Sequence, residues 1–247
     1  MISYILLFCI LISSSTIESK VLPKYISKCS IANADEFSKC VLKNSKKIVP
    51  LILNGDKNLK IPNLNPLFIE ILQLDSGSSL NLTLLNQTIR GMPTVNIKSV
   101  TYNKDSRQLQ FGYEFDNLRL DGQYAINGKI LILPVVGNGK GFIDFQKPKL
   151  VYTCNLDIIE NKKGVEVIRI ANASLKADFD KVVFYMENLF NGNKALGDEM
   201  NKFLNDNWKE VITEFQELVK SPMTTVFSNI LGAFLNDLTY DAAFDGV

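Results

Sequence analysis

The sequence predicts an α+β fold in which a highly curved antiparallel sheet wraps around one long C-terminal helix. Two patterns and one absence support this prediction. Apolar and polar residues alternate over residues 67–186, which indicates antiparallel strands with one face exposed to solvent. Over residues 192–238 the apolar residues recur at steps of three and four, as they do on an amphipathic helix. No second helical segment is long enough to cover this helix, so the sheet is its expected partner.

A short N-terminal helix is expected in addition. Asn33 can act as its N-cap, with Glu36 at the capping-box position. Pro50 should interrupt the helix late, and Asn54-Gly55 should end it. The apolar residues between these signals follow helical spacing: Phe37, Val41, Ile48 and Ile52.

The alternation changes parity at Leu84-Leu85 and again over residues 116–118. A slip of one residue moves the apolar side chains to the other face, so both positions predict β-bulges that increase the curvature of the sheet. The first slip would also turn Asn86 outward. Asn81 and Asn172 fall on the polar parity of their strands.

The C-terminal helix is expected to be nearly continuous. At about 1.5 Å per residue it would span roughly 65–70 Å, which is long for a globular protein. Pro222 is the only proline in this segment, and it should kink or break the helix.

The composition excludes several classes of function. Lys and Arg total 27 against 26 Asp and Glu, so the charge gives no reason to expect nucleic acid or an anionic membrane as a partner. The sequence has no histidine, which rules out Ser-His-Asp and Cys-His catalysis and removes the usual zinc ligand. A GxSxG nucleophile elbow is also missing. We therefore expect no enzyme activity, no metal and no cofactor.

The N-terminal residues resemble a secretory signal. Residues 5–12 (ILLFCILI) form a short apolar run, and small polar residues follow it. We expect residues 1–19 to be a signal peptide and residues 20–247 to form a single domain. A membrane anchor is the competing interpretation, but the run is shorter than the ~20 residues that span a bilayer. Stable membrane insertion is therefore not expected.

Export agrees with three glycosylation sequons, which begin at Asn81, Asn86 and Asn172. Removal of the signal peptide would leave three cysteines: Cys29, Cys40 and Cys154. An odd number leaves one thiol without an intramolecular partner. Cys154 lies on the apolar parity of its strand, so it is a small buried side chain, the site of an intermolecular disulfide or a reactive thiol.

Four segments, in order, resemble the insect juvenile hormone-binding protein/takeout family. The first begins with Leu22-Pro23 and contains Cys29 and Cys40, and the second covers residues 54–67 and includes IPNLNPL. The third is GQYAINGKILILPVVGNG at residues 122–139, and the fourth runs from NLFNGNKALG at residue 188 to Trp208. Together the match covers essentially the whole mature chain.

The resemblance implies an internal tunnel for one apolar ligand, such as a juvenile hormone-like isoprenoid or a fatty-acid-like lipid. It also implies a disulfide between Cys29 and Cys40 near the end of the tunnel. Hormone-binding members of the family have a second disulfide, whereas only Cys154 remains here, so the takeout-like branch fits better. The expected function is that of a secreted, extracellular carrier.

Eight residues of the strands and of the helical stripe are the expected ligand contacts, although ordinary core packing is an alternative for each. Tyr124 could donate a hydrogen bond to a ligand oxygen, or its hydroxyl could be satisfied by the backbone. Gly137–Gly141 resembles a phosphate loop but lacks its spacing, so we expect a tight hairpin there. The eight residues are Tyr124, Ile130, Leu133, Phe142, Leu204, Trp208, Val211 and Phe215.

Two other functions were weighed against the carrier. The first is a secreted interaction or surface-active protein with the same fold, a filled core and no dedicated ligand. The second is a hydrolase or isomerase, which the missing histidine argues against. The sequence identifies no receptor or other protein partner.

Overall fold

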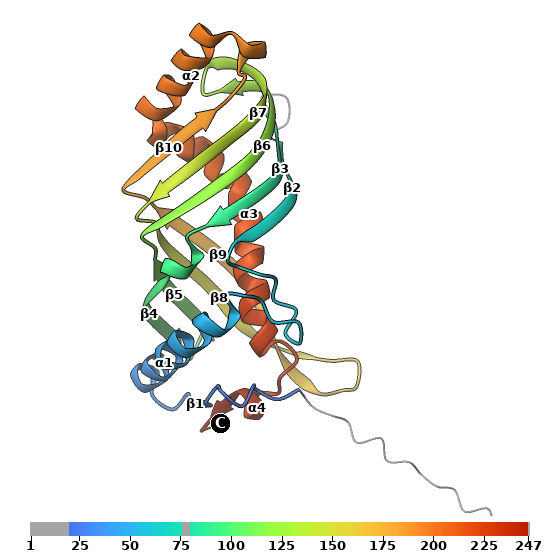
Figure 1. Ribbon diagram of the computed structural model, residues 1–247. Coiled ribbons are helices and arrows are strands. Elements are labelled where there is room, and N and C mark those ends of the chain that lie inside the picture. Colours follow the sequence, from blue (N-terminus) through green and yellow to red (C-terminus); the bar gives the residue numbers. More distant parts are fainter. Residues whose placement is uncertain (1–19, 76–79, 247) are drawn as a thin grey trace, which may run out of the picture.

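A computed structural model describes residues 20–75 and 80–246 of the chain. The expected signal peptide, residues 1–19, lies outside the described residues. The molecule is elongated, with two curved antiparallel sheets stacked end to end along a long C-terminal helix (Figure 1). This arrangement confirms the predicted fold class, although the curved layer consists of two sheets rather than one.

The upper sheet has five strands in the order β10-β7-β6-β3-β2. All of its neighbouring strands are antiparallel. The strands are β2 (Leu67–Asp75), β3 (Leu80–Arg90), β6 (Asn117–Ile130), β7 (Leu133–Gln146) and β10 (Lys181–Met186).

The lower sheet has four antiparallel strands in the order β4-β5-β8-β9. They are β4 (Asn96–Asn103), β5 (Gln108–Glu114), β8 (Lys149–Glu160) and β9 (Glu166–Asp178). The 3₁₀ turn η1 (Met92–Thr94) connects β3 to β4, and η2 (Phe190–Gly192) lies between β10 and the helix that follows it. At the lower end β1 (Cys29–Ser30) pairs in parallel with β11 (Phe244–Asp245), beside the short helix α4 (Tyr240–Ala243).

Of the two expected bulges, only the first is present. The β3–β6 register shifts between Leu85 and Thr88, and Asn86 has a φ of 50° and an exposed side chain. The second expectation is wrong, because residues 115–116 connect β5 of the lower sheet to β6 of the upper sheet. The change of parity there marks a change of sheet. A bulge that the sequence did not suggest lies at Asn172, with φ 47°, opposite β8.

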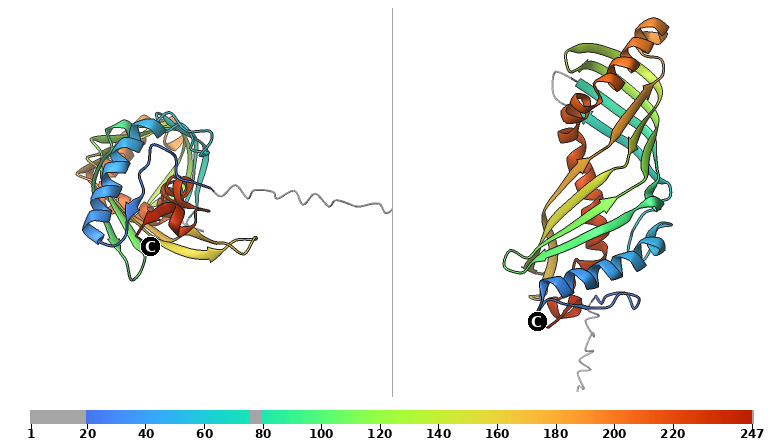
Figure 2. Two further views of the ribbon diagram at one scale, coloured as in Figure 1. Left: turned by 90° about the horizontal axis from the view of Figure 1, so that it is seen from below. Right: turned by 90° about the vertical axis from the view of Figure 1, so that its left-hand side faces the viewer.

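The N-terminal helix α1 (Ala34–Ile52) begins and ends near the expected positions. The Asn33 side chain accepts hydrogen bonds from the backbone N–H groups of Asp35 and Glu36, so Asn33 is the N-cap. Pro50 lies inside the last turn, and Gly55, with φ 79°, follows the end of the helix. The helix lies across the lower end of the molecule, against β4 (Figures 1 and 2).

The C-terminal segment forms two helices rather than one. They are α2 (Lys194–Asp206) and α3 (Trp208–Leu235), which meet at Asn207, where φ is −110° and ψ is 31°. Pro222 was expected to kink or break the helix; a break there is wrong, since α3 continues through that residue. The 28 residues of α3 correspond to about 42 Å.

The break at Asn207 lets α2 cover the edge of the upper sheet. Asn205 accepts a hydrogen bond from Phe184 N (2.9 Å) and donates one to Phe184 O (2.8 Å). Asn201 makes the same pair of bonds with Met186, at 2.8 and 2.9 Å. These side chains satisfy backbone groups that strand β10 would otherwise expose at the edge of the sheet.

The sheets pack on the two halves of α3. The N-terminal half contributes Val211 and Phe215 to an upper cluster, with Leu82 and Ile126 from the strands. The C-terminal half contributes a different set to a lower cluster: Met223, Phe227, Leu231 and Leu235. Among the described residues, no helix is both long and apolar enough to cross a membrane.

Candidate ligand-binding cavity

A cavity of about 190 Å³ lies at the lower end of the molecule, between α1, the strands β4 and β5, and the C-terminal half of α3. Its wall is almost entirely aliphatic and aromatic. The helices and strands contribute these lining residues: Phe37, Val41, Ile48 and Val49 from α1; Ile97 from β4; Leu109, Phe111 and Tyr113 from β5; Phe227, Ile230, Leu231 and Phe234 from α3.

The periodicities seen in the sequence explain why the wall is apolar. Phe37, Val41 and Ile48 share one face of α1 because they follow helical spacing. Leu109, Phe111 and Tyr113 share one face of β5 because strand side chains alternate. The cavity lies where these faces meet α3, and its lining contains no Lys, Arg, Asp or Glu among the described residues.

Two of the polar side chains in the wall are bonded within the protein. Asn44 of α1 donates to the carbonyl oxygen of Ser27 at 2.7 Å, which joins the helix to the N-terminal arm, residues 20–28. Ser45 donates to the carbonyl oxygen of Val41 at 2.8 Å, within the same helix. Neither group therefore needs a ligand to satisfy it.

A disulfide joins Cys29 to Cys40, with the two Cα atoms 5.7 Å apart. The pairing that the family resemblance implied is thereby confirmed. Cys29 itself lines the cavity, as do Leu22 and Ile26 of the N-terminal arm. The disulfide holds the start of the chain to α1 at the place where the arm closes the lower end.

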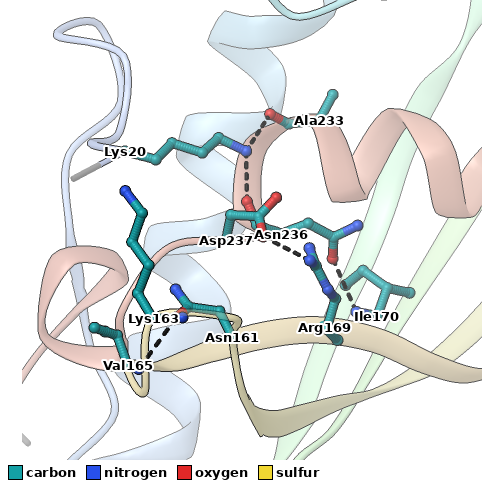
Figure 3. A network of polar contacts seen from close by, with 9 residues as sticks. All are labelled: Lys20, Asn161, Lys163, Val165, Arg169, Ile170, Ala233, Asn236 and Asp237. Carbon is teal, nitrogen blue, oxygen red and sulfur yellow. Dashed lines mark hydrogen bonds and ion pairs between the residues drawn. The ribbon is translucent and has the colours of Figure 1, made fainter. Parts of the chain in front are cut away.

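Lys20 ties the other end of the arm to the C-terminus of α3 (Figure 3). Its Nζ donates to the carbonyl oxygens of Ala233, at 3.1 Å, and Asn236, at 2.6 Å. A cation suits the partial negative charge at a helix C-terminus. Burial lowers the pKa of Lys20, and the nearby carboxylate of Asp237 opposes that effect.

The same helix end is bound to strand β9 (Figure 3). Arg169 forms an ion pair with Asp237 at 2.6 Å. The Asn236 side chain accepts a hydrogen bond from Ile170 N at 2.9 Å. The arm, the end of α3 and β9 therefore meet in one polar network beneath the cavity.

The eight residues expected to contact a ligand do not line this cavity. Seven of them belong to the upper cluster, where they pack between α3, α2 and the five-stranded sheet: Tyr124, Ile130, Leu133, Leu204, Trp208, Val211 and Phe215. In the structure these residues pack against one another in the hydrophobic core. A ligand contact at these residues stays a prediction.

Phe142 lies on the outer face of the upper sheet, so the expectation that it faces the helix is wrong. The Arg119 guanidinium carbon is 3.7 Å from the centre of its ring, and the Tyr185 ring stacks on it at 5.5 Å. Side chains alternate along β7, and Val135 and Ile143 have the inward parity. Phe142 has the other parity and must point outward.

The hydroxyl of Tyr124 donates to the carbonyl oxygen of Glu187, so the backbone satisfies this side chain. Burial raises its pKa to about 12. The sequence predicted a tight hairpin at Gly137–Gly141. This prediction is wrong, because these glycines lie inside β7. A Cβ on Gly139 would be 2.7 Å from the Glu187 carbonyl oxygen. The glycines therefore allow the segment after β10 to lie against the sheet.

Cys154 is a buried free thiol, with 0% of its surface exposed. Burial raises its pKa to about 11. Of the three interpretations left open by the sequence, the structure supports the small buried side chain, because an enclosed sulfur cannot reach a second molecule and a thiol with a raised pKa is a poor nucleophile.

A helix enclosed lengthwise by curved antiparallel sheets, with an apolar cavity at one end, defines a tubular cavity-containing class of protein. Residues 5–245 match the family model for haemolymph juvenile hormone binding protein (JHBP). The chain belongs to this family, which is one of binding proteins. The resemblance found in the sequence is thereby confirmed.

Relatives and a solved structure agree with this assignment. The circadian clock-controlled protein daywake of Drosophila melanogaster is 23% identical over 237 residues, which cover 92% of this chain and 90% of that protein. Daywake of Drosophila yakuba is 21% identical over 236 residues, covering 92% and 89%. The crystal structure of Epiphyas postvittana Takeout 1 superposes with a TM-score of 0.70 and 25% identity, over 83% of this chain and 92% of that one.

Proposed function

We propose that the protein is a secreted carrier that encloses one small hydrophobic ligand, a juvenile hormone-like isoprenoid or a fatty-acid-like lipid, in the lower cavity. The observation that supports this function is an uncharged, apolar cavity of about 190 Å³ between α1, β4–β5 and α3. Membership in a family of binding proteins points in the same direction.

Burial of apolar surface would provide the affinity. Each methylene group moved from water into the cavity contributes about 0.8 kcal/mol. An apolar cavity of about 150 Å³ already holds a benzene molecule, so the lower cavity suits a ring or a short segment of chain. A longer ligand would have to displace part of the wall. The N-terminal arm is the part of the wall with no regular secondary structure, and hydrogen bonds of Lys20, Ser27 and Lys28, with the disulfide just after it, hold it in place.

The carrier is tested by displacement of a fluorescent apolar probe, N-phenyl-1-naphthylamine, from protein stripped of lipid. Leu231→Trp and Val49→Phe each enlarge a side chain in the wall, and each should weaken probe binding at least tenfold. Ile132→Trp is the matched control, because Ile132 is 84% exposed, in the turn after β6. Equal probe binding by wild type and both cavity variants would argue against this site.

The competing function is an interaction protein of the same fold without a dedicated ligand. It predicts that native mass spectrometry of protein purified without denaturants finds only the mass of the empty chain. The carrier predicts one additional apolar molecule per chain, recovered by solvent extraction.

Secretion has separate support in the sequence and in the exposure of the sequons. Asn81, Asn86 and Asn172 are all exposed, as an acceptor of a glycan must be. Expression of the full chain in insect cells should deliver glycosylated protein to the medium, with its N-terminus near residue 20. Retention in the cells with residues 1–19 still attached would contradict this part of the proposal.

A further inference from the structure

The wall of the cavity contains a tyrosine, Tyr113. It lies on β5, and its ring contacts Phe111, at 5.9 Å between ring centres, and Phe227 of α3, at 5.2 Å. Two aromatic residues thus fix its orientation. Phe227 belongs to the helix that the sheets enclose, so Tyr113 packs against that helix.

The hydroxyl is deep within the protein. Burial strongly raises its pKa, and the neighbouring Tyr152 and Cys154 act in the same direction. The residue nevertheless keeps part of its surface accessible. A side chain can be both deeply buried and partly accessible if its accessible surface faces an internal cavity. Tyr113 is one of the residues that line this cavity.

Within residues 20–75 and 80–246, Tyr113 differs from the other buried tyrosines in that its hydroxyl has no hydrogen-bond partner. Tyr102 shares a hydrogen bond with Tyr240 at 3.1 Å, Tyr152 shares one with Ser228 at 2.9 Å, and Tyr124 donates to Glu187. Fully enclosed side-chain nitrogen and oxygen atoms of the described residues all have partners. The Tyr113 oxygen therefore borders open space, and that space is the cavity.

The charges around the hydroxyl limit what can bind to it. A phenol that stays protonated donates a hydrogen bond, so it suits an accepting oxygen. No Lys or Arg lies in the described lining, so an ionised carboxylate would be buried without a counter-ion, which is unfavourable. A neutral oxygen, as in an ester or an ether, avoids this cost. A pure hydrocarbon would leave the hydroxyl unsatisfied.

We propose that Tyr113 is a specificity-determining residue, whose hydroxyl donates a hydrogen bond to a neutral oxygen of an otherwise apolar ligand in the lower cavity. This inference rests on the proposed carrier function. It makes an apolar ester or ether the preferred class of ligand, ahead of an alkane or an ionised fatty acid of similar length.

Displacement of N-phenyl-1-naphthylamine by methyl dodecanoate, dodecanoate and tridecane tests the inference. Wild type should bind the ester most tightly. In Tyr113→Phe the affinity for the ester should fall about five- to tenfold, the cost of one hydrogen bond, while the affinity for tridecane is unchanged. Tyr152→Phe is the matched control: it removes the same atom from the neighbouring strand, but that hydroxyl is bonded to Ser228 and does not line the cavity. Its ratio of ester to alkane affinity should equal that of wild type.

Two further measurements separate recognition from stability. The infrared carbonyl band of bound methyl dodecanoate should lie at the lower frequency of a hydrogen-bonded ester in wild type and in Tyr152→Phe, and at that of a free ester in Tyr113→Phe. The melting temperature of empty Tyr113→Phe should stay close to that of wild type, whereas Tyr152→Phe should melt lower because it leaves Ser228 with one bond fewer.

The outcomes distinguish the two proposals. Failure of wild type to bind any of the four apolar molecules would overturn both the carrier function and the role of Tyr113. Binding of the alkane and the ester with the same ratio in wild type and Tyr113→Phe, and a free-ester carbonyl band in wild type, would overturn the role of Tyr113 alone.

Discussion

The Lys20 ammonium group lies 2.6 Å from the carbonyl oxygen of Asn236, and so joins the start of the described chain to the C-terminus of the helix that both sheets enclose. Residues 20 and 236 are far apart in sequence, yet they form one corner of the molecule (Figure 3). Leu22 and Ile26, which follow Lys20, line the cavity. The contact therefore holds an apolar segment of the arm over the cavity.

Replacing Lys20 with methionine should weaken the attachment of the arm to the C-terminus of α3, while keeping an apolar side chain of similar length. The loss of two charge-assisted hydrogen bonds at a helix C-terminus should lower the free energy of unfolding by about 1–2 kcal/mol. It should also speed the dissociation of a bound probe, measured by stopped-flow fluorescence. Lys24→Met is the control, since Lys24 is an exposed lysine on the same arm. Equal dissociation rates in the two variants would contradict a role for Lys20 in closing the cavity.

Removal of the disulfide should affect stability and binding together. Cys29 and Cys40 are 11 residues apart, and a closed loop of this length is worth about 3 kcal/mol through chain entropy. The double variant Cys29→Ala, Cys40→Ala should unfold at a correspondingly lower urea concentration and bind the fluorescent probe more weakly. A variant that lost stability but bound the probe as wild type does would show that the arm is not part of the site.

Cys154 should make the fold sensitive to alkali. Burial raises its pKa to about 11, above the ordinary thiol value of 9.0, so the folded state favours the neutral thiol. The free energy of unfolding is unaffected below pH 9 and falls between about pH 9 and 11, by about 2 kcal/mol for this group. Urea unfolding at pH 8 and 10.5 should show a smaller loss in Cys154→Ala. Rapid reaction of the native thiol with Ellman's reagent at pH 8 would contradict its burial.

The close contact between β7 and the segment after β10 predicts opposite effects for two glycine substitutions. Gly139→Ala places a Cβ 2.7 Å from the backbone oxygen of Glu187 and should cost about 1–3 kcal/mol. Gly197→Ala meets nothing closer than 3.7 Å and lies in α2, so it should stabilise the protein by about 0.5–1 kcal/mol. Thermal unfolding measures both. Destabilisation by both would indicate that the space around Gly197 is tighter than described.

Much of the fold follows from periodicity. Strand alternation identified the sheets, the cap at Asn33 identified the start of α1, and the length of the C-terminal apolar stripe required a sheet around it. The break at Asn207 was missed because Leu204, Trp208 and Val211 keep helical spacing across it. Asn201 and Asn205, four residues apart on α2, were the available signal, since their side chains bind the edge of β10.

The location of the cavity could not be predicted in the same way. Both halves of α3 carry large apolar side chains, and the sequence does not reveal which half packs tightly. The central residues Trp208 and Val211 were expected to enclose a ligand, yet they belong to the packed upper cluster. The lower cavity depends on how α1 and the arm meet β5, and such long-range packing has no local pattern. Tyr113, a tyrosine on the apolar parity of β5, was a local sign of a polar group in that wall.

Photo-crosslinking tests the position of the ligand most directly. A methyl ester of a diazirine-bearing fatty acid, irradiated in complex with the protein and mapped by peptide mass spectrometry, should label residues of α1, β5 and the C-terminal half of α3, between Phe227 and Leu235. Labelling confined to the upper cluster, at Leu204, Trp208 or Val211, would contradict the account and place the ligand at the other end of the molecule.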